Sequence, residues 1–384
     1  MRLERSTPRR LDLGGITSTS ILAVVLAVMW ATLAILPATR NTFLTQGNIA
    51  MLLAQSAVLL VVSVGMTFVV LIRGIDLSVG SAVALTGVVA ALVHNSLGMP
   101  VPVAIAAALA AGAAIGAWHG LWVAWLGVPA FVATLAGFKA YRGGALVLSH
   151  ARSLTMGDDF AFLDARVPAT VTCAIVLAVV ACGIALTLRD ATRRRALGLE
   201  PLTTATVTAR CAGQIILAAV VLAVFGARGV PAVVLVAGAV ALAGVFVLAR
   251  TRLGRHLYAI GGNPEAAKLS GIDVRRVTLV AYVIVGVLAA LAGLLLAART
   301  NSVTPGSQGN LLELDAVTAV VIGGTSLSGG RGSVVGTVLG TLVFTTLANG
   351  MNLLAIDSNW QLVCTGSILL AAVLVDVLSK RKRS

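Results

Sequence analysis

The sequence predicts an all-α protein, a polytopic bundle of about twelve membrane-spanning helices with both ends of the chain in the cytoplasm. Composition is the first observation: 58% of the 384 residues are hydrophobic and 11% are charged, with a mean hydropathy of +1.00. These values exclude an ordinary soluble globular domain. The other two observations are the spacing of the apolar runs and the placement of the basic residues.

Apolar runs of about membrane-spanning length recur along the whole chain. A helix needs about 20 apolar residues to cross a bilayer, so each run is a candidate crossing. The runs lie at residues 16–36, 48–72, 77–95, 101–126, 129–148, 167–188, 211–227, 229–250, 277–298, 313–328, 334–355 and 361–379. Several leave almost no room for a loop between them, so the pattern allows some segments to be broken or re-entrant.

The first run follows a basic segment, as in a secretory signal peptide. However, residues 16–36 reach spanning length and no clear small-residue cleavage site follows them, so we interpret this run as a retained crossing. With the N-terminus inside, 21 of the 28 Lys and Arg residues fall on the cytoplasmic side and 5 outside, while Lys139 and Arg142 lie within a run. This asymmetry follows the positive-inside rule and supports twelve crossings.

One transmembrane domain, residues 16–379, therefore makes up nearly the whole chain. Basic cytoplasmic tails are expected at residues 1–15 and 380–384. Two cytoplasmic loops are expected within the domain, an Arg-rich one at 189–210 and a longer polar one at 251–276.

The polar segment Thr251 to Arg276 contains a short helix with both ends marked. Asn263 is expected to be its N-cap, Pro264 its first residue and Gly271 its C′ residue. Two turns span about 10 Å, far too little to cross a bilayer. The alternative is an ordinary surface helix, but we predict a contact with a soluble partner, with two alanines as a small-residue face. The predicted contact residues are Gly261, Gly262, Asn263, Pro264, Glu265, Ala266 and Ala267.

Polar side chains in or near the apolar runs are candidates for a translocation pathway. They are Gln55, Asp76, Ser78, Thr134, Asn349, Asn352 and Gln361. Asp76 either caps the helix that follows it or faces the pathway. Because an unpaired buried charge is costly, we expect it to pair with Arg73, Lys139 or Arg142, and we favour Arg142, for which Glu313 is the alternative carboxylate. Lys139 and Arg142 are three residues apart on one helix face, which is expected to point into the bundle or reach its edge.

Several function classes find no support. The segment GGTSLSGGRGSVVG lacks the Lys-Ser/Thr of a Walker A motif, so ATP and Mg²⁺, if used, bind to another subunit. The four cysteines and four histidines form no metal-site or catalytic pattern. We therefore expect no catalytic residue, no metal and no cofactor bound by this chain. Basic residues interleaved with aromatics are missing, which argues against nucleic acid as a partner.

Two features concern packing and internal repetition. Glycines at four-residue spacing, Gly112, Gly116 and Gly120 and again Gly332, Gly336 and Gly340, let helices approach closely. Residues 72–80 (IRGIDLSVG) and 322–330 (IGGTSLSGG) share five of nine residues, which favours a parallel internal repeat.

Five motifs in order give the chain a resemblance over about residues 45–378. They are GIDLSVGS (Gly74 to Ser81), PAFVATLAG with YRGG (Pro129 to Gly144), TRLGRHLYAIGGNPEAAKLSGI (Thr251 to Ile272), VIGGTSLSGGRGSVVGT (Val321 to Thr337) and LANGMNLL with WQ (Leu347 to Gln361). Through these motifs the chain resembles the membrane permease subunits of ribose- and xylose-type carbohydrate ABC transporters. The segment from 167 to 227 is similar to the longer, xylose-type members.

The resemblance implies an importer in the inner or plasma membrane of a bacterium. Two permease copies, expected to form a homodimer in the lipid bilayer, would make the pathway for a monosaccharide, such as the pentose xylose. An ABC ATPase subunit would drive transport and an extracytoplasmic sugar-binding protein would deliver the sugar. The segment containing GGNPEAA would be the coupling segment that meets the ATPase.

Arg73 departs from the family pattern, which usually has glycine there. Alternative functions are a permease for another small solute, such as a branched-chain amino acid or nucleoside, an ion-coupled secondary transporter, and a structural or receptor membrane protein.

Overall fold

The computed structural model describes residues 14–198, 200, 202–226 and 229–381. Most of the predicted basic tails, residues 1–13 and 382–384, lies outside this range. The α-helices are α1 (Gly14–Ile35), α2 (Gln46–Leu71), α3 (Val79–Ala91), α4 (Val101–Ala124), α5 (Ala130–Leu148), α6 (Ala169–Ala196), α7 (Thr204–Phe225), α8 (Ala232–Arg250), α9 (Arg252–Gly262), α10 (Pro264–Leu269), α11 (Val274–Thr300), α12 (Leu312–Ile322), α13 (Val334–Leu353) and α14 (Ser358–Arg381). A π-helical turn, Leu92–Ser96, extends α3, and a 3-10 turn, Asp158–Leu163, precedes α6.

The all-α prediction is confirmed, since the described strands are only β1 (Leu154–Thr155) and β2 (Ser302–Val303), which pair antiparallel. Within the described residues, nine helices are long and apolar enough to cross a membrane: α2, α3 with its π turn, α4, α6, α7, α8, α11, α13 and α14. The other three apolar runs form α1, α5 and α12. The side of the membrane on which each chain end lies stays a prediction.

The run at 313–328 is not one continuous helix. Helix α12 has 11 residues, about 16 Å of helix, and residues 323–333 continue without helix to the start of α13. Gly324 adopts a φ of +83°, a left-handed conformation that ends a helix at little cost for glycine. The segment is a broken helix, as the short spacing of the runs allowed.

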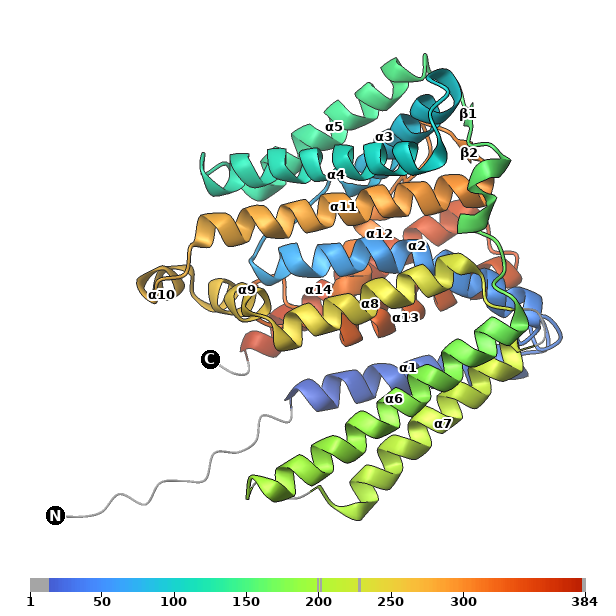
Figure 1. Cartoon of the computed structure of the whole chain (residues 1–384), viewed down its shortest axis with the longest axis vertical. Helices are drawn as coiled ribbons and strands as arrows, with labels where there is room; N and C mark the ends of the chain where they lie inside the picture. Colours follow the sequence, from blue (N-terminus) through green and yellow to red (C-terminus); the bar gives the residue numbers. More distant parts are fainter. Residues whose placement is uncertain (1–13, 199, 201, 227–228, 382–384) are drawn as a thin grey trace.

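Helices α2 and α11 run side by side through the middle of the bundle (Figure 1). Helices α3, α4 and α5 lie on one side of this pair, and α8, α13 and α14 lie on the other (Figure 1). Helix α12 packs against α2 and α13. Most residues of α2 are buried. The close packing predicted for glycines is confirmed between α4 and α11, because a β-carbon at Gly112 or Gly116 would collide with the α11 backbone at Gly286 or Tyr282.

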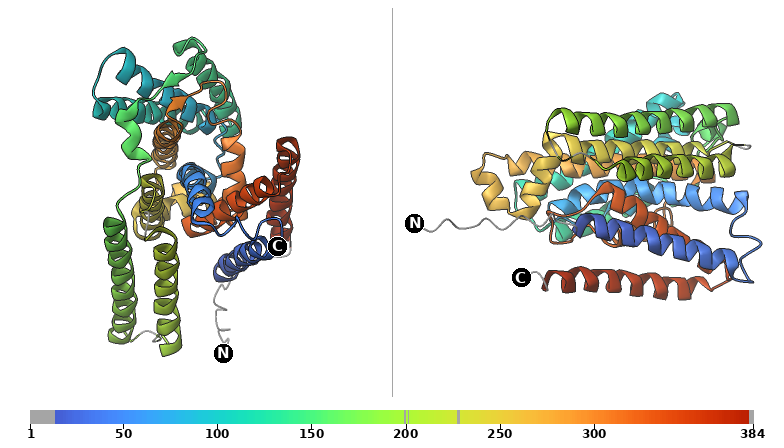
Figure 2. Two further views of the ribbon diagram at one scale, coloured as in Figure 1. Left: turned by 90° about the vertical axis from the view of Figure 1, so that its right-hand side faces the viewer. Right: turned by 90° about the horizontal axis from the view of Figure 1, so that it is seen from below.

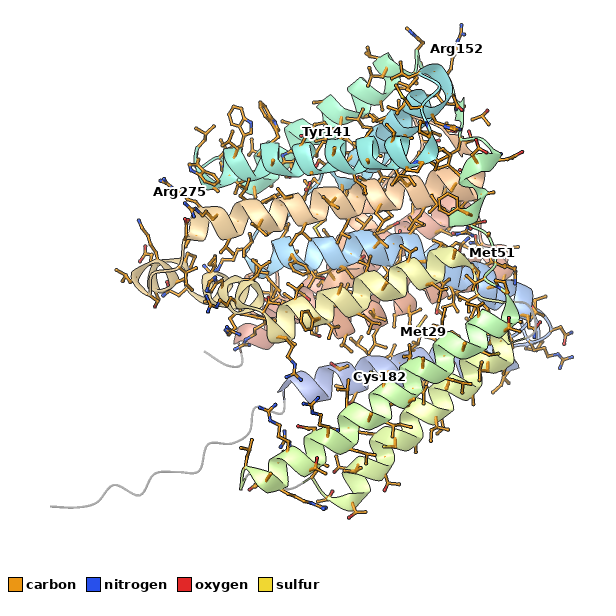
Figure 3. The ribbon with its side chains drawn as sticks, in the orientation of Figure 1. Met29, Met51, Tyr141, Arg152, Cys182 and Arg275 are labelled. Atoms are coloured by element: carbon orange, nitrogen blue, oxygen red, sulfur yellow. The ribbon has the colours of Figure 1, made fainter. Side chains whose placement is uncertain are left out.

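Helices α9 and α10 lie at the end of the bundle where α1 begins and α14 ends (Figure 1). Arg275 lies at this end and Arg152 at the opposite one (Figure 3), as their opposite assignments in the charge count require. At the opposite end, β1 and β2 join the segment after α5 to the segment after α11, with Leu154 opposite Val303.

Helices α6 and α7 form a hairpin that packs mainly on itself and stands apart from the bundle (Figure 2). The Arg-rich segment 189–210 was predicted to be a loop, but most of it is helical. Helix α6 continues to Ala196 and α7 begins at Thr204. Three arginines occupy the last turn of α6, where positive charge interacts favourably with the helix dipole.

Candidate functional site

The short helix α10 has the caps expected from its sequence. The Asn263 side-chain oxygen accepts hydrogen bonds from the backbone N–H of Glu265 at 3.0 Å and of Ala266 at 3.1 Å. Pro264 is the first helical residue, and Gly271 follows with a φ of +82°. These capping contacts are all made within residues 263–271.

The exposed face of α10 differs from the predicted one at one position. Glu265 and Ala266 are exposed, but Ala267 is 4% exposed and packs into the bundle core. Leu269 instead is 90% exposed, three residues from Ala266 and so on the same side of the helix. The sequence signal for Leu269 was a single large apolar residue in an otherwise polar capped helix.

Helix α9 precedes α10 and was not predicted. The Thr251 side chain caps it by accepting from the Gly254 N–H at 3.2 Å. Leu257 and Ile260 are buried, which fixes α9 on the bundle. Gly261 is buried too, against the backbone of Leu71 and Gly330, so it holds the helix in place and offers a partner little surface, unlike the exposed Gly262 and Asn263.

Arg73 links α9 to the turn between α2 and α3. Its Nε donates to the Gly261 carbonyl at 2.8 Å and its Nη2 to the Gly262 carbonyl at 2.7 Å. The predicted pairing of Arg73 with Asp76 is therefore wrong, because the guanidinium points to α9.

Asp76 is 2% exposed and sits in a buried polar cluster. Its Oδ1 accepts from the Ser78 N–H at 2.8 Å and from the Ser78 hydroxyl at 2.6 Å. The Ser78 oxygen lies 3.1 Å from His119 Nε2 on α4. Because the Ser78 hydroxyl donates its proton to Asp76, its oxygen can only accept from His119. The Nε2 atom of His119 is therefore protonated and donates to the Ser78 oxygen. Sequence analysis missed His119, which is far from Asp76 along the chain.

Two tyrosines complete the surroundings of His119. The ring centroids of Tyr141 and Tyr282 lie 5.4 and 6.4 Å from the His119 ring. Both hydroxyls, and His119 Nδ1, are buried without a hydrogen-bond partner among the described residues. Three polar groups without a hydrogen-bond partner among the described residues therefore lie near the Asp76 carboxylate.

The favoured pair of Asp76 with Arg142 is wrong. Arg142 Nη1 donates to the carbonyls of Pro305 at 2.8 Å and Gln308 at 2.7 Å, and so holds the loop before α12. Thr134, on the same helix, donates to the Ile75 carbonyl at 3.2 Å. Arg142 is eight residues further along α5, about 12 Å away, so it cannot reach the turn.

Lys139 does not share a buried face with Arg142. It is exposed, with Nζ 5.8 Å from the centre of the Phe138 ring. No ion pair joins Asp76 to Arg73, Lys139 or Arg142 in the part of the chain that the structure describes.

The remaining pathway candidates lie in separate places. Asn349 is buried and exchanges two hydrogen bonds with Asn48, at 3.1 and 2.8 Å. Gln361 donates to the Asn352 side chain at 2.9 Å, in the turn that joins α13 to α14. Gln55 is exposed on α2. Among the described residues, the structure brings these candidates together in two places, Asp76, Ser78 and Thr134 at the α2–α3 turn and Asn352 with Gln361 near the α13–α14 turn.

A cavity of about 320 Å³ lies among the α2–α3 turn, the α4–α5 connection and the start of α11, with Pro264 at its edge. Its lining includes Arg73 and Gly74 from the α2–α3 turn, Pro264 from α10, and Arg275 and Tyr282 from α11. The exposed α10, the Arg73 link and the buried polar cluster therefore lie next to one another at one end of the bundle.

Comparison with known proteins gives consistent matches over almost the whole chain. Residues 48–373 match the family model described as branched-chain amino acid transport system / permease component. The xylose transport system permease protein XylH of Escherichia coli (strain K12) is 40% identical over 368 residues, covering 94% of this chain and 91% of the relative. XylH of Haemophilus influenzae is 38% identical, covering 94% and 96%. The ribose import permease protein RbsC of Escherichia coli (strain K12) is 37% identical, covering 90% of each chain. No solved structure matches the chain.

Proposed function

The chain belongs to the branched-chain amino acid transport system / permease component family, and we propose that it is the permease subunit of an ABC importer for xylose. Its relatives are permease proteins of xylose and ribose transport, and none of them is described as an enzyme. The chain is therefore a multi-pass permease subunit for sugar transport. The finer proposal is that ATP and Mg²⁺ bind to a separate ATPase subunit and that a binding protein delivers the pentose from outside.

The single observation that carries the proposal is the exposed face of α10. A fully exposed leucine side chain forgoes about 1.5 to 3 kcal/mol of burial free energy, and Leu269 is 90% exposed on a capped helix whose Ala267 packs into the bundle core. A soluble partner with an apolar groove would cover it. The ATPase subunit fits this role, because α10 connects through α9 and α11 to the bundle on both sides.

The assignment of xylose rests on the relatives and on the mostly uncharged polar side chains of the bundle interior. The first relatives named are xylose permeases. The interior candidates apart from Asp76 are hydroxyl and amide groups, which exchange hydrogen bonds with sugar hydroxyls without binding them tightly. Arg142 is engaged by carbonyl groups and Lys139 is exposed, so neither offers a buried site for a carboxylate substrate. Two copies of the chain are proposed to enclose the pathway.

The assembly is tested by reconstituting the chain with its ATPase and binding protein in proteoliposomes. We expect xylose to stimulate ATP hydrolysis, and leucine and nucleosides to leave it unchanged. Stimulation by ribose alone would overturn the xylose assignment, and stimulation by leucine alone would overturn the sugar assignment. Uptake that a protonophore abolishes and ATP removal leaves intact would indicate an ion-coupled transporter.

Docking at α10 is tested with Leu269→Asp. We expect this change to weaken co-purification of the ATPase by about tenfold or more, since it places a charge in the apolar contact. The matched control is Leu197→Asp, because Leu197 is 61% exposed at the end of α6 and lies outside α10. Equal co-purification of the ATPase with both variants would contradict docking at α10.

A further inference from the structure

Three chain segments that are far apart in the sequence meet beside α10. They are the end of α9, the turn after α2 at residues 72–78 and the loop after α12 at residues 323–333. The Gly330 N–H donates to the Leu71 carbonyl at 2.9 Å, and a β-carbon at Gly261 would collide with both groups. The three backbones are therefore in direct contact.

The Arg73 side chain crosses from the turn to the end of α9. The carbonyls of Gly261 and Gly262 belong to the last turn of α9, where carbonyl groups lack helical partners. A planar guanidinium that donates to two such groups fixes both distance and orientation, and its positive charge is favoured at a helix C-terminus. This link joins the partner-facing helices to the bundle by a directional contact.

The backbone conformation of Arg73 is one that favours glycine, so the presence of arginine there indicates a role for its side chain. Arg73 has a φ of +66°, and the Gly74 N–H donates to the Val69 carbonyl at 2.9 Å, which closes the end of α2. Glycine adopts this conformation without strain, and a residue with a β-carbon does not. An arginine here carries a strain that glycine would relieve, and its two hydrogen bonds to α9 are what glycine would lose.

Beyond Arg73 the turn leads straight to the buried polar cluster. Asp76, three residues later, holds Ser78 by two hydrogen bonds, and Ser78 contacts His119 on α4. Ser78 directly precedes α3. A displacement of the turn therefore moves the start of α3 and its contact with α4. The cavity of about 320 Å³ adjoins the turn at Arg73 and Gly74, so the turn is not packed tightly on that side.

We propose that Arg73 is a positioning residue that transmits movement of the α9–α10 pair to the α2–α3 turn and its Asp76 cluster. The inference rests on the proposed function, since the movement comes from the ATPase. It adds the route by which that movement enters the bundle. Transmission of the movement depends on the two hydrogen bonds of the Arg73 side chain. The backbone conformation of the turn alone does not transmit it.

The experiment compares Arg73→Gly, Arg73→Gln and Arg73→Lys in proteoliposomes that hold the ATPase and binding protein. The measured quantity is the ratio of xylose-stimulated to unstimulated ATP hydrolysis. We expect Arg73→Gly to lower this ratio at least about fivefold, the low end of typical coupling between sites. Arg73→Lys keeps a charge that reaches one carbonyl and should restore part of the ratio, whereas Arg73→Gln should restore less. The control is Arg255→Gln, because Arg255 is exposed on α9 and forms no ion pair within the described part of the chain; its ratio should equal that of the wild type.

A structural role for Arg73 would give a different result. In that case Arg73→Gly would lower the melting temperature and the co-purification of the ATPase along with the ratio, and Arg73→Lys would not rescue the ratio. A wild-type ratio in Arg73→Gly would overturn the positioning role. If Arg73→Gly does not fold, equal ratios in Arg73→Lys and Arg73→Gln overturn it. No stimulation by any sugar with the wild-type chain would instead overturn the proposed function, so the two failures are distinguishable.

Discussion

The turns that follow α2 and α12 have the same backbone design and different side chains. After α2, the Arg73 N–H donates to Val70 and the Gly74 N–H to Val69, both at 2.9 Å. After α12, the Gly324 N–H donates to Val321 at 2.9 Å and the Thr325 N–H to Val320 at 3.1 Å. The φ of Arg73 and that of Gly324 are both positive. The same way of ending a helix therefore occurs twice, but after α12 it comes one residue later than in the sequence repeat, which aligns Arg73 with Gly323.

The side chains after each turn also correspond. Asp76 accepts from the Ser78 N–H, and Ser326 accepts from the Ser328 N–H at 3.3 Å. The first turn uses Arg73, which reaches α9, and Asp76, which holds the Ser78 that contacts His119, whereas the second uses glycine and serine. We infer from these similar backbones and different side chains that the turn geometry ends the helix. The side-chain link to α9 comes from Arg73, which is present in the first turn.

The largest expected difference between the turns is at their acceptor side chains. Asp76→Ala removes a buried charged acceptor and leaves two Ser78 donors unsatisfied, which should lower the free energy of unfolding by about 2 to 3 kcal/mol. Ser326→Ala removes a neutral acceptor and should cost about 1 kcal/mol or less. Thermal unfolding of both variants in detergent measures the difference. Equal melting temperatures would show that the charge at Asp76 adds nothing to stability.

The positive-φ residues should respond to substitution in opposite ways. Gly324→Ala places a β-carbon in the left-handed conformation and should destabilise the chain by about 1 kcal/mol. Arg73→Gly relieves that strain and loses two hydrogen bonds, so its net change should be smaller, within about 1 kcal/mol of zero. The same melting experiment checks both. A large loss in Arg73→Gly together with none in Gly324→Ala would break the correspondence of the two turns.

The smallest expected effect concerns the contact of α9 with the second turn. The Tyr258 hydroxyl donates to the Gly332 carbonyl at 2.8 Å, and burial raises its pKa, so it stays a protonated donor. Tyr258→Phe removes one neutral hydrogen bond, about 0.5 to 1.5 kcal/mol, and should lower the ATPase stimulation ratio less than Arg73→Gly does. If Tyr258→Phe lowers the ratio more than Arg73→Gly does, the main link between α9 and the bundle is the contact with the second turn.

Local features of the sequence determined the helices and the caps. Each of the twelve apolar runs contains a helix, because length and hydropathy act within one segment. The caps of α10 were predictable, since Asn263 and Gly271 act on groups only a few residues away. The five shared motifs likewise identified the permease family before any contact was known, as the relatives of xylose and ribose transport confirm.

Contacts between distant segments were decided only by the tertiary structure. The partners of Arg73, Asp76 and Arg142 depend on how far along each neighbouring helix a residue lies. A charge on α5 eight residues past Thr134 is about 12 Å beyond the turn that it was expected to reach. Burial of Ala267 and exposure of Leu269 depend in the same way on which face of α10 meets the bundle. Composition and spacing carry no information on these distances, because helix packing sets them through side chains that are remote in sequence.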